Sequence, residues 1–146
     1  DIFRIDAYGL KWRKTAWSFI GYIEGEPVSH VGVLGHTVGV ENHPILVGGI
    51  AAVVTLPSAR GRGYAHRTLD AATPFLRDNL KAEFGLLFCL DELMSFYGKM
   101  GWKKVEDPVI VDQPQGQVVY PMNVMVLPFR ERQWPGGRVE LNSLPW

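Results

Sequence analysis

One short stretch of the sequence combines residue types that can bind an anion, Arg60-Gly61-Arg62-Gly63-Tyr64-Ala65. It follows an apolar run of small and β-branched residues at 50–54 and precedes a segment with apolar residues at helical spacing. Glycines let the backbone turn its N–H groups inward, and the first turn of a helix adds unpaired donors. The two arginines could meet a pyrophosphate with paired hydrogen bonds. The pattern therefore predicts a phosphate-binding loop between a buried strand and a helix.

Three other interpretations of this loop are a tight turn with two solvated arginines, a P-loop and a dinucleotide-binding turn. A P-loop needs a Lys-Ser or Lys-Thr pair after its glycines, and none follows here. A Rossmann turn needs a third glycine, where this sequence has His66, and an acidic residue at the end of the next strand. The nearest acidic residue, Glu83, begins that strand instead. The strand, loop and helix context favours phosphate binding over a simple turn.

The loop resembles the acetyl-coenzyme A site of the GNAT superfamily of N-acetyltransferases, whose signature is Gln/Arg-x-x-Gly-x-Gly/Ala after a strand. Arg60, Gly63 and Ala65 stand at the fixed positions of that signature. Downstream, Phe-Tyr-Gly-Lys-Met-Gly-Trp at residues 96–102 is similar to the Tyr-x-x-x-Gly-Phe/Trp segment of the same family. The resemblance covers roughly residues 15–127.

This resemblance implies the α/β (α+β) fold class, with a twisted, mostly antiparallel mixed sheet splayed around acetyl-CoA as acyl donor. It places the pyrophosphate on the loop and gives Val53 and Val54 the role of offering backbone groups to the pantetheine arm. A backbone N–H there could polarise the thioester carbonyl. Tyr97 would be the general acid, because a phenol of pKa ~10 can protonate a thiolate whose thiol titrates near ~8.5. The alternative for Tyr97 is an ordinary packed aromatic residue.

The sequence does not identify a general base. Some members of the family carry a glutamate on the strand before the loop, but residues 49–54 contain no carboxylate. Glu24, His30, Glu41 or a chain of water molecules are substitutes, and none is assigned. The four histidines lack the spacing of a metal site, so no metal is expected.

The tail of the chain is similar to that of aminoglycoside 2′-N-acetyltransferases, through Trp134, Glu140 and Trp146. If the tail lines the acceptor site, Asp112, Glu140 and the free carboxylate of Trp146 could bind the ammonium groups of an amino sugar. The acceptor would then be a small-molecule amine. The alternatives are a tail strand that closes the sheet, another small amine or a peptide amino terminus as acceptor, and a coenzyme A-binding domain without turnover.

The size and charge of the chain limit the other possibilities. A length of 146 residues predicts a single domain, with a cofactor core at about 15–127 and an acceptor-side tail at 128–146. Lys plus Arg and Asp plus Glu both number 15, so no net field indicates nucleic acid or membrane as partner. The lone Cys89 excludes an internal disulfide framework, which makes a cytoplasmic location the default. A homodimer stays an option, and we expect an amino-terminal portion to precede Asp1.

Strand formers and turn residues predict two hairpins before the loop. The expected elements are a helix tail and loop at 1–14, a hairpin of 17–24 with 28–34, a second hairpin of 37–41 with 45–50, a strand at 50–54, a helix at 64–79, a strand at 84–90, a short helix at 91–100, a strand from 102 to 105, a loop at 109–117 and a last strand region at 118–127. Gly48 and Gly49 suggest a bulge, and Pro74 should kink or shorten the long helix. Asp91 should cap the short helix and Gly101 should stop it.

Overall fold

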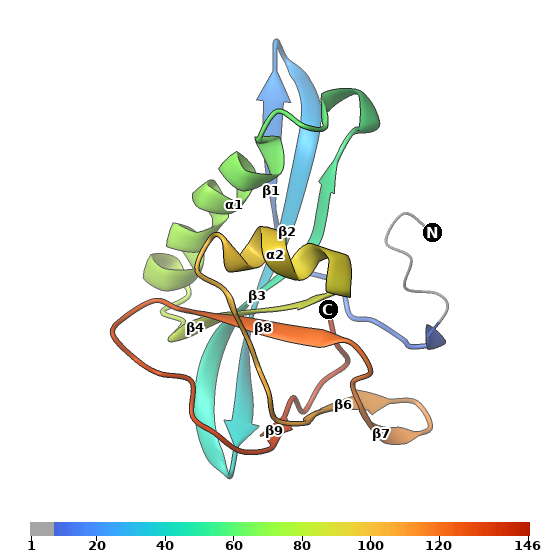
Figure 1. The fold of residues 1–146 in the computed structure, drawn as a ribbon, viewed down its shortest axis with the longest axis vertical. Helices are drawn as coiled ribbons and strands as arrows, with labels where there is room; N and C mark the ends of the chain where they lie inside the picture. Colours follow the sequence, from blue (N-terminus) through green and yellow to red (C-terminus); the bar gives the residue numbers. More distant parts are fainter. Residues whose placement is uncertain (1–7) are drawn as a thin grey trace.

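The computed structural model describes residues 8–146. In this part of the chain, nine strands form one sheet in the order β5-β8-β4-β3-β2-β9-β6-β7, with β1 paired to β2 (Figure 1). The strands are β1 (Trp17–Ile23), β2 (Glu26–Val40), β3 (His43–Thr55), β4 (Phe84–Cys89), β5 (Lys103–Lys104), β6 (Val109–Gln113), β7 (Gly116–Val119), β8 (Asn123–Pro128) and β9 (Val139–Glu140). The α-helices are α1 (Tyr64–Pro74) and α2 (Met94–Gly98). The helix tail expected in residues 1–14 lies partly outside the described residues, and residues 10–15 form no regular element.

Two long strands, β2 and β3, form the backbone of the sheet. Both predicted hairpins are confirmed: β1 pairs antiparallel with the first half of β2, and the second half of β2 turns back into β3. Each long strand runs through two segments that the sequence had suggested as separate strands. The second half of β2 alternates buried and more exposed residues, from Val38 to Val40, as expected for a strand with one face on a core.

The sheet opens between β3 and β4. These two strands run parallel and pair over four residues each, from Val47 with Phe84 to Ile50 with Leu87. Beyond these pairs β3 continues to Thr55, while β4 continues to Cys89 with hydrogen bonds only to β8 on its other edge. Among the strand pairs of residues 8–146, only β3–β4 and β6–β9 are parallel. The expected mixed, mostly antiparallel and splayed sheet flanked by helices is therefore confirmed.

Gly48 and Gly49 do not form the predicted bulge, because they pair regularly with Gly35 and Leu34. Their role is to admit large side chains on opposite faces of the sheet. A Cβ on Gly48 would lie 2.7 Å from the Cβ of Leu76, and one on Gly49 would lie 2.6 Å from the indole of Trp146. The close approach of these side chains is what requires glycine at both positions.

The bulge lies three residues later, at Ala52 and Val53 of β3. His30 pairs with Val54 and Gly32 with Ala51, so two residues of β3 face one residue of β2. Ala52 has a φ of +50°, a conformation that costs an ordinary L-residue about 1–2 kcal/mol. A bulge sharpens the local twist and bends the strand. Here it bends β3 at the point where the strand leaves β4.

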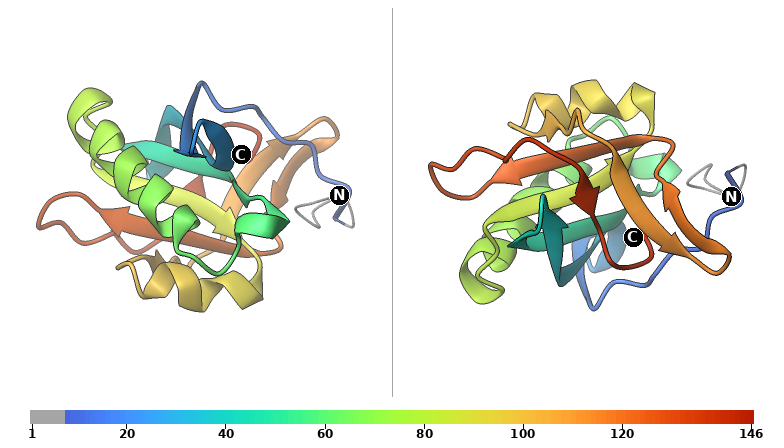
Figure 2. Two further views of the ribbon diagram at one scale, coloured as in Figure 1. Left: turned by 90° about the horizontal axis from the view of Figure 1, so that it is seen from above. Right: turned by 90° about the horizontal axis from the view of Figure 1, so that it is seen from below.

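The two faces of the sheet carry separate hydrophobic cores. Helices α1 and α2 cover one face, which we call the helix face, and the β6–β7 hairpin and the tail cover the other, which we call the tail face (Figure 2). On the helix face, Leu69 and Leu76 pack with Val33 and Ile50 of the sheet. On the tail face, Trp146 packs with residues of β2, β4 and β9.

Helix α1 ends where its proline predicts. Pro74 closes the α-helix, and a π-helical turn, Phe75–Asn79, completes the segment, with the N–H of Leu80 donating to the carbonyl of Phe75 at 3.1 Å. Since proline lacks an N–H and clashes with the preceding turn, an α-helical hydrogen bond is lost there. The predicted span of residues 64–79 is thus confirmed, with the α-helical part shortened.

The second helical segment starts as a 3-10 turn, Asp91–Leu93, before α2. The predicted cap is wrong, because the Asp91 carboxylate does not bond to the helix and instead accepts a hydrogen bond of 2.6 Å from the Asn123 side chain. The predicted stop is confirmed. Gly101 has a φ of +95°, and the N–H of Trp102 returns to the carbonyl of Tyr97 at 3.2 Å.

The loop predicted at residues 109–117 is also wrong. Pro114 and Gln115 form only the turn of a hairpin, in which β6 pairs with β7 from Ile110 with Val119 to Gln113 with Gly116. The tail then contributes β9, which pairs with β2 on one side and β6 on the other. Strand β9 therefore attaches the hairpin to the main sheet.

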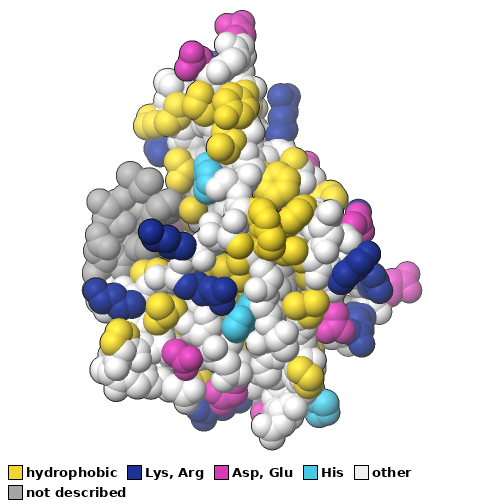
Figure 3. Space-filling model, turned by 180° about the vertical axis from the view of Figure 1, so that it is seen from behind, with side chains coloured by type: hydrophobic (Ala, Val, Ile, Leu, Met, Phe, Trp, Pro, Cys, Tyr) yellow, Lys and Arg dark blue, Asp and Glu magenta, His cyan; other side chains and the backbone are white. Residues whose placement is uncertain are grey.

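The surface has no dominant charge. Figure 3 shows basic and acidic side chains interspersed over one face of the molecule, in line with the balanced composition. Within residues 8–146, the helices are too short and too polar for any of them to span a membrane.

Gly49→Ala tests the packing of the Trp146 indole against β3. The new Cβ would collide with the indole, so we expect a loss of about 1–3 kcal/mol of unfolding free energy in denaturant titrations. Gly35→Ala is the matched control, since a Cβ there meets only the Leu80 Cδ1 at an ordinary 3.7 Å. Equal stability of the two variants would contradict close packing at Gly49.

Candidate active site

A cavity of about 550 Å³ lies where β3 and β4 separate. Residues 50–53 of β3 and 87–90 at the end of β4 form its sides, and residues 12–15 of the amino-terminal segment close it from outside. Among the residues predicted for the site, the cavity brings together Val53, Tyr97 and Trp146.

This cavity passes through the sheet from one face to the other. Ala51 and Phe88 belong to the core of the tail face, whereas Ile50, Cys89 and Tyr97 belong to the core of the helix face. Both sets line the cavity. Two molecules approaching from opposite faces could therefore meet between the strands without either one crossing the sheet.

Tyr97 forms the wall on the helix face. Its ring is 5% exposed and packs edge-on against Phe96 and Trp102, at centroid distances of 5.0 and 6.1 Å. Within residues 8–146 its hydroxyl has no hydrogen-bond partner. Burial, and then the neighbouring Cys89, raise the pKa of Tyr97 above its ordinary value. The phenol is consequently neutral throughout the physiological pH range.

A second buried phenol, Tyr120, lies on the tail face of the cavity. It is 5% exposed, and its ring contacts Phe88 at 4.6 Å and Trp12 at 5.9 Å between centroids. Burial is the main cause that raises the pKa of Tyr120. Sequence reasoning missed this residue, because Tyr120 follows a strand and precedes a proline and belongs to no motif. Only its position across the cavity from Tyr97 distinguishes it.

His30 supports the bulge from the neighbouring strand. The Nδ1 of His30 donates to the carbonyl of Ala52 at 2.8 Å, and its Nε2 lies 2.8 Å from the Ser18 hydroxyl. A carbonyl can only accept, so the hydrogen is on Nδ1. This bond satisfies the Ala52 carbonyl at the point where the bulge interrupts the regular ladder with β2. Ala52 and Val53, on the edge that β4 has left, line the cavity.

The predicted phosphate loop lies beyond the end of β3 and does not line the cavity. Gly61 and Gly63 have φ values of +80° and +79°, and a Cβ on either would meet no atom within 4 Å. Gly63 is the N-cap of α1 and supplies no side-chain acceptor to the first turn. Arg60 donates from Nε to the carbonyl of Thr55 at 3.1 Å, and Arg62 is exposed. The surface of the loop, with the N–H groups of the first turn of α1, is therefore open to a ligand.

The predicted acidic residues lie elsewhere. Asp112 accepts a hydrogen bond of 3.3 Å from Gln117, and Glu140 pairs with Arg138 at 2.8 Å. Neither lines the cavity, and Val54 lies just outside it. Of the residues described in residues 8–146, no Asp or Glu contributes its side chain to the cavity lining.

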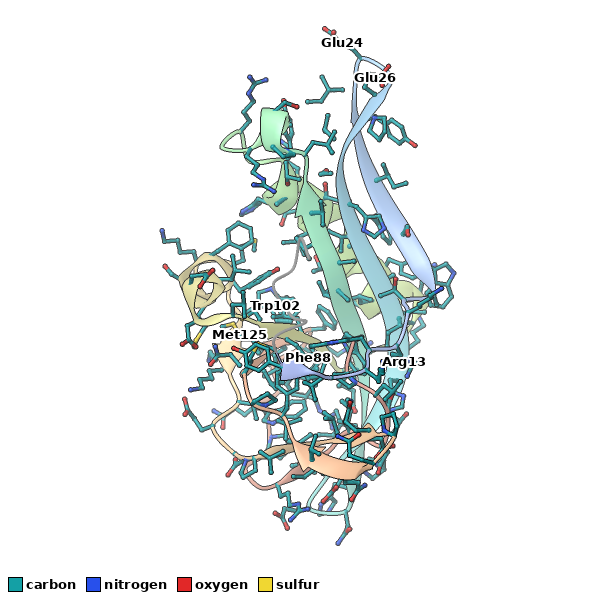
Figure 4. The ribbon with its side chains drawn as sticks, turned by 90° about the vertical axis from the view of Figure 1, so that its right-hand side faces the viewer. Arg13, Glu24, Glu26, Phe88, Trp102 and Met125 are labelled. Atoms are coloured by element: carbon teal, nitrogen blue, oxygen red, sulfur yellow. The ribbon has the colours of Figure 1, made fainter. Side chains whose placement is uncertain are left out.

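The substitutes for a general base are also distant or occupied. Glu24 lies at the tip of the β1–β2 hairpin, far from Phe88 at the middle of the molecule (Figure 4). Glu41 lies in the turn between β2 and β3 and accepts a hydrogen bond of 2.9 Å from the N–H of Arg138. His30 is committed to the bulge. The described residues also contain no group of three or more His, Cys, Asp or Glu side chains placed to hold a metal.

The pKa of the Cys89 thiol provides a test of whether solvent reaches the cavity wall. Burial, and then the charge of Asp91, raise the pKa of Cys89 from 9.0 to about 11. Because the pKa is raised in the folded protein, the unfolded chain loses the thiol proton at a lower pH than the folded chain does. The stability that the buried, protonated thiol contributes is therefore complete below about pH 9 and is lost as the pH rises toward about 11. From about pH 8 to about pH 10.5, wild type should lose about 2 kcal/mol more unfolding free energy than Cys89→Ala. Equal losses in denaturant titrations would show a solvated thiol.

The family model for the acetyltransferase (GNAT) domain matches residues 7–105. No curated protein matches the sequence. Among solved structures, a GNAT family N-acetyltransferase (YhbS) from Escherichia coli in complex with CoA is similar at 14% identity and a TM-score of 0.62, over 97% of this chain and 73% of that one. Naa20 from Chaetomium thermophilum, in complex with a bisubstrate analogue, is similar at 18% identity and a TM-score of 0.59, over 83% of this chain and 74% of that one.

A GNAT family acetyltransferase from Brucella melitensis, in complex with acetyl-CoA, has 17% identity and a TM-score of 0.59, over 86% of this chain. This chain spans 66% of the length of the Brucella protein. At these identities the likeness to solved structures concerns the fold. The family model covers well over half of the 146 residues, and the chain therefore belongs to the GNAT family of acetyltransferases.

Proposed function

We propose that this protein transfers the acetyl group of acetyl-CoA to a primary amine. The observation that carries the proposal is the cavity through the sheet, with the neutral phenol of Tyr97 in its wall. An acyl donor and an amine can reach each other there from opposite faces. Similar folds in the Escherichia coli and Brucella melitensis proteins hold CoA and acetyl-CoA, which supports the same donor here.

The residues present suit that donor. The open loop offers Arg60 and Arg62, with the N–H groups near Gly61 and Gly63 and in the α1 turn from Tyr64 and Ala65, to a pyrophosphate. The free edge of β3 offers the peptide groups of Val53 and its neighbour Val54 to the amide groups of a pantetheine arm. When bound, acetyl-CoA supplies the activated thioester. The strand edge would orient the thioester, and a backbone N–H at the bulge would stabilise negative charge on its carbonyl oxygen.

Tyr97 would act as the general acid. Its Oη carries a proton at neutral pH because burial disfavours the phenolate. Within residues 8–146 that hydroxyl has no competing hydrogen bond, so it is free to donate to the sulfur leaving group. Solvent would restore the Tyr97 proton after each turnover.

The acceptor amine must lose its own proton before it can attack. With no Asp or Glu side chain in the described cavity lining, a carboxylate base of this kind has no support. Burial of an amine in an apolar cavity lowers its pKa and so increases the neutral fraction. We infer that desolvation of the acceptor takes over part of the role of a base.

An aminoglycoside acceptor stays a prediction with reduced support. Of Asp112, Glu140 and Trp146, only Trp146 lines the cavity. A peptide amino terminus or another small amine as acceptor stays an alternative, and so does a coenzyme A-binding domain without turnover. A cytoplasmic location and a homodimer also stay predictions.

Gly63→Val tests the donor site. Valine is strongly disfavoured at a φ of +79°, and its side chain would block the approach of a phosphate to the loop. We expect the Kd for acetyl-CoA, measured by calorimetry, to rise at least ~10-fold. Gly25→Val is the matched control, because Gly25 has a φ of +81° and equally open surroundings at a hairpin tip. Wild-type protein that binds no acetyl-CoA would contradict the proposal.

Tyr97→Phe tests the acid. The ring and its packing stay, but the proton donor is lost, so we expect kcat to fall by ~10²–10⁴-fold. The Kd for acetyl-CoA should change less than about twofold, since the hydroxyl acts on the leaving group. Thiol release with any accepted amine measures the first, and calorimetry measures the second. An unchanged kcat in a variant of normal thermal stability would show that Tyr97 is an ordinary packed aromatic residue.

A further inference from the structure

The tail face of the cavity is walled by aromatic rings from four separate parts of the chain. Trp12, Phe88, Tyr120 and Trp146 form this aromatic wall. Phe88 lies at its centre, with centroid distances of 4.6 Å to Tyr120, 5.4 Å to Trp146 and 6.4 Å to Trp12. These spacings and the steep angles between the rings are those of aromatic clusters in protein cores. A further ring entering the cavity would find edges and faces at the same spacings.

The polar groups of the aromatic wall are few. The indole N–H of Trp146 is already used, as it donates to the carbonyl of Leu86 at 3.2 Å. The Tyr120 hydroxyl has no hydrogen-bond partner within residues 8–146. The wall therefore presents mainly carbon to an acceptor, with one phenol able to give or accept a hydrogen bond.

The charge beside the aromatic wall is positive. The guanidinium of Arg13 lies 6.0 Å from the centroid of the Trp146 ring, and its Nη1 is within 3.2 Å of His36 and 3.1 Å of Ser143. Lys14 follows it along the cavity, while the described lining includes no acidic side chain. Apart from the carboxylate of Trp146, the additional ammonium groups of a polycation would meet like charge and no acidic side chain in the described lining, which is unfavourable.

We propose that the acceptor is a monoamine on an apolar, ring-bearing carbon skeleton, with its ring packed against the aromatic wall. This inference rests on the proposed acetyl transfer and names its substrate class. The amine nitrogen would form the amide bond with its lone pair, the thioester C–S bond would break, and the sulfur would take the Tyr97 proton. The remaining ammonium proton leaves for solvent.

Binding of an apolar, ring-bearing monoamine is also consistent with a described cavity lining that holds no Asp or Glu side chain. Ring burial provides roughly 25 cal/mol of binding free energy per Å² of apolar surface removed from water. The same desolvation lowers the pKa of the attached amine. A polycation would gain less from ring burial, because its other charged groups hold water around the reacting amine.

The test compares 2-phenylethylamine with kanamycin as acceptors, at saturating acetyl-CoA, by thiol release. We expect kcat/KM for 2-phenylethylamine to be at least ~10-fold higher. Trp12→Ala should raise the KM for 2-phenylethylamine at least ~5-fold and leave the KM for acetyl-CoA within about twofold. Val119→Ala is the control, since Val119 is 60% exposed next to Tyr120 and does not line the cavity.

Amine binding to the protein with CoA bound, followed by quenching of tryptophan fluorescence, gives a second measurement. Trp12→Leu, which removes the ring and keeps an apolar side chain, serves if Trp12→Ala fails to fold; it should also raise the KM for 2-phenylethylamine. An equal or higher kcat/KM for kanamycin would overturn the inference and leave the proposed acetyl transfer intact. So would binding of CoA without binding of 2-phenylethylamine. Absence of acetyl-CoA binding would instead overturn the proposed function itself.

Discussion

The short parallel pairing of β3 with β4 is the constraint on which the site depends. Four residue pairs hold the strands together, and Gly48 and Gly49 lie within this stretch. Leu76 from one face and Trp146 from the other close over those glycines, so the paired segment is fixed from both sides. The strands can then separate beyond Ile50 without loosening the rest of the sheet. A cavity through a sheet is otherwise costly, because it leaves backbone groups without ladder partners.

The bulge at Ala52 lies where β3 separates from β4. A regular β3 would continue alongside β4 and close the opening, whereas the bulge turns the strand and turns the Ala52 carbonyl toward β2. His30 takes up that carbonyl from a strand that never contacts the cavity. The hydrogen bond from His30 thus stabilises the strained backbone of Ala52, with its φ of +50°, from the β2 side. The free strand edge in front stays available for a ligand.

Local patterns predicted the parts of the fold that depend on neighbours in the chain. The hairpins, the helix shortened by Pro74 and the stop at Gly101 follow from alternation, turn residues and backbone preferences. Errors arose where a distant partner outweighed a local rule. Asp91 bonds to Asn123 rather than to its own helix, and Gly49 serves Trp146 rather than a bulge.

The residues of the site also fall into those that a local motif predicts and those that depend on distant contacts. The donor side is drawn from a nearly contiguous region, residues 50–101, whose motifs can be recognised in a sequence. Tyr120 and Trp12 carry no motif, and their convergence on Phe88 depends on the completed sheet. The acidic residues of the tail looked suitable by charge alone, but β9 orients Glu140 toward Arg138. Charge in a sequence shows what a residue can bind and not which surface it faces.

The bond between the two ends of the described chain has a consequence for how the site is assembled. Among the contacts that hold residues 12–15 at the cavity, the N–H of Arg13 donates to the carbonyl of Pro145 at 2.8 Å, and its guanidinium bonds to Ser143, 130 residues further along the chain. Contacts of such high sequence separation carry the largest loop-closure entropy and form late in folding. They also open first, since few buried groups hold an irregular segment in place. We therefore expect the acceptor side of the cavity to assemble after the donor side, because its contacts join the two ends of the described chain.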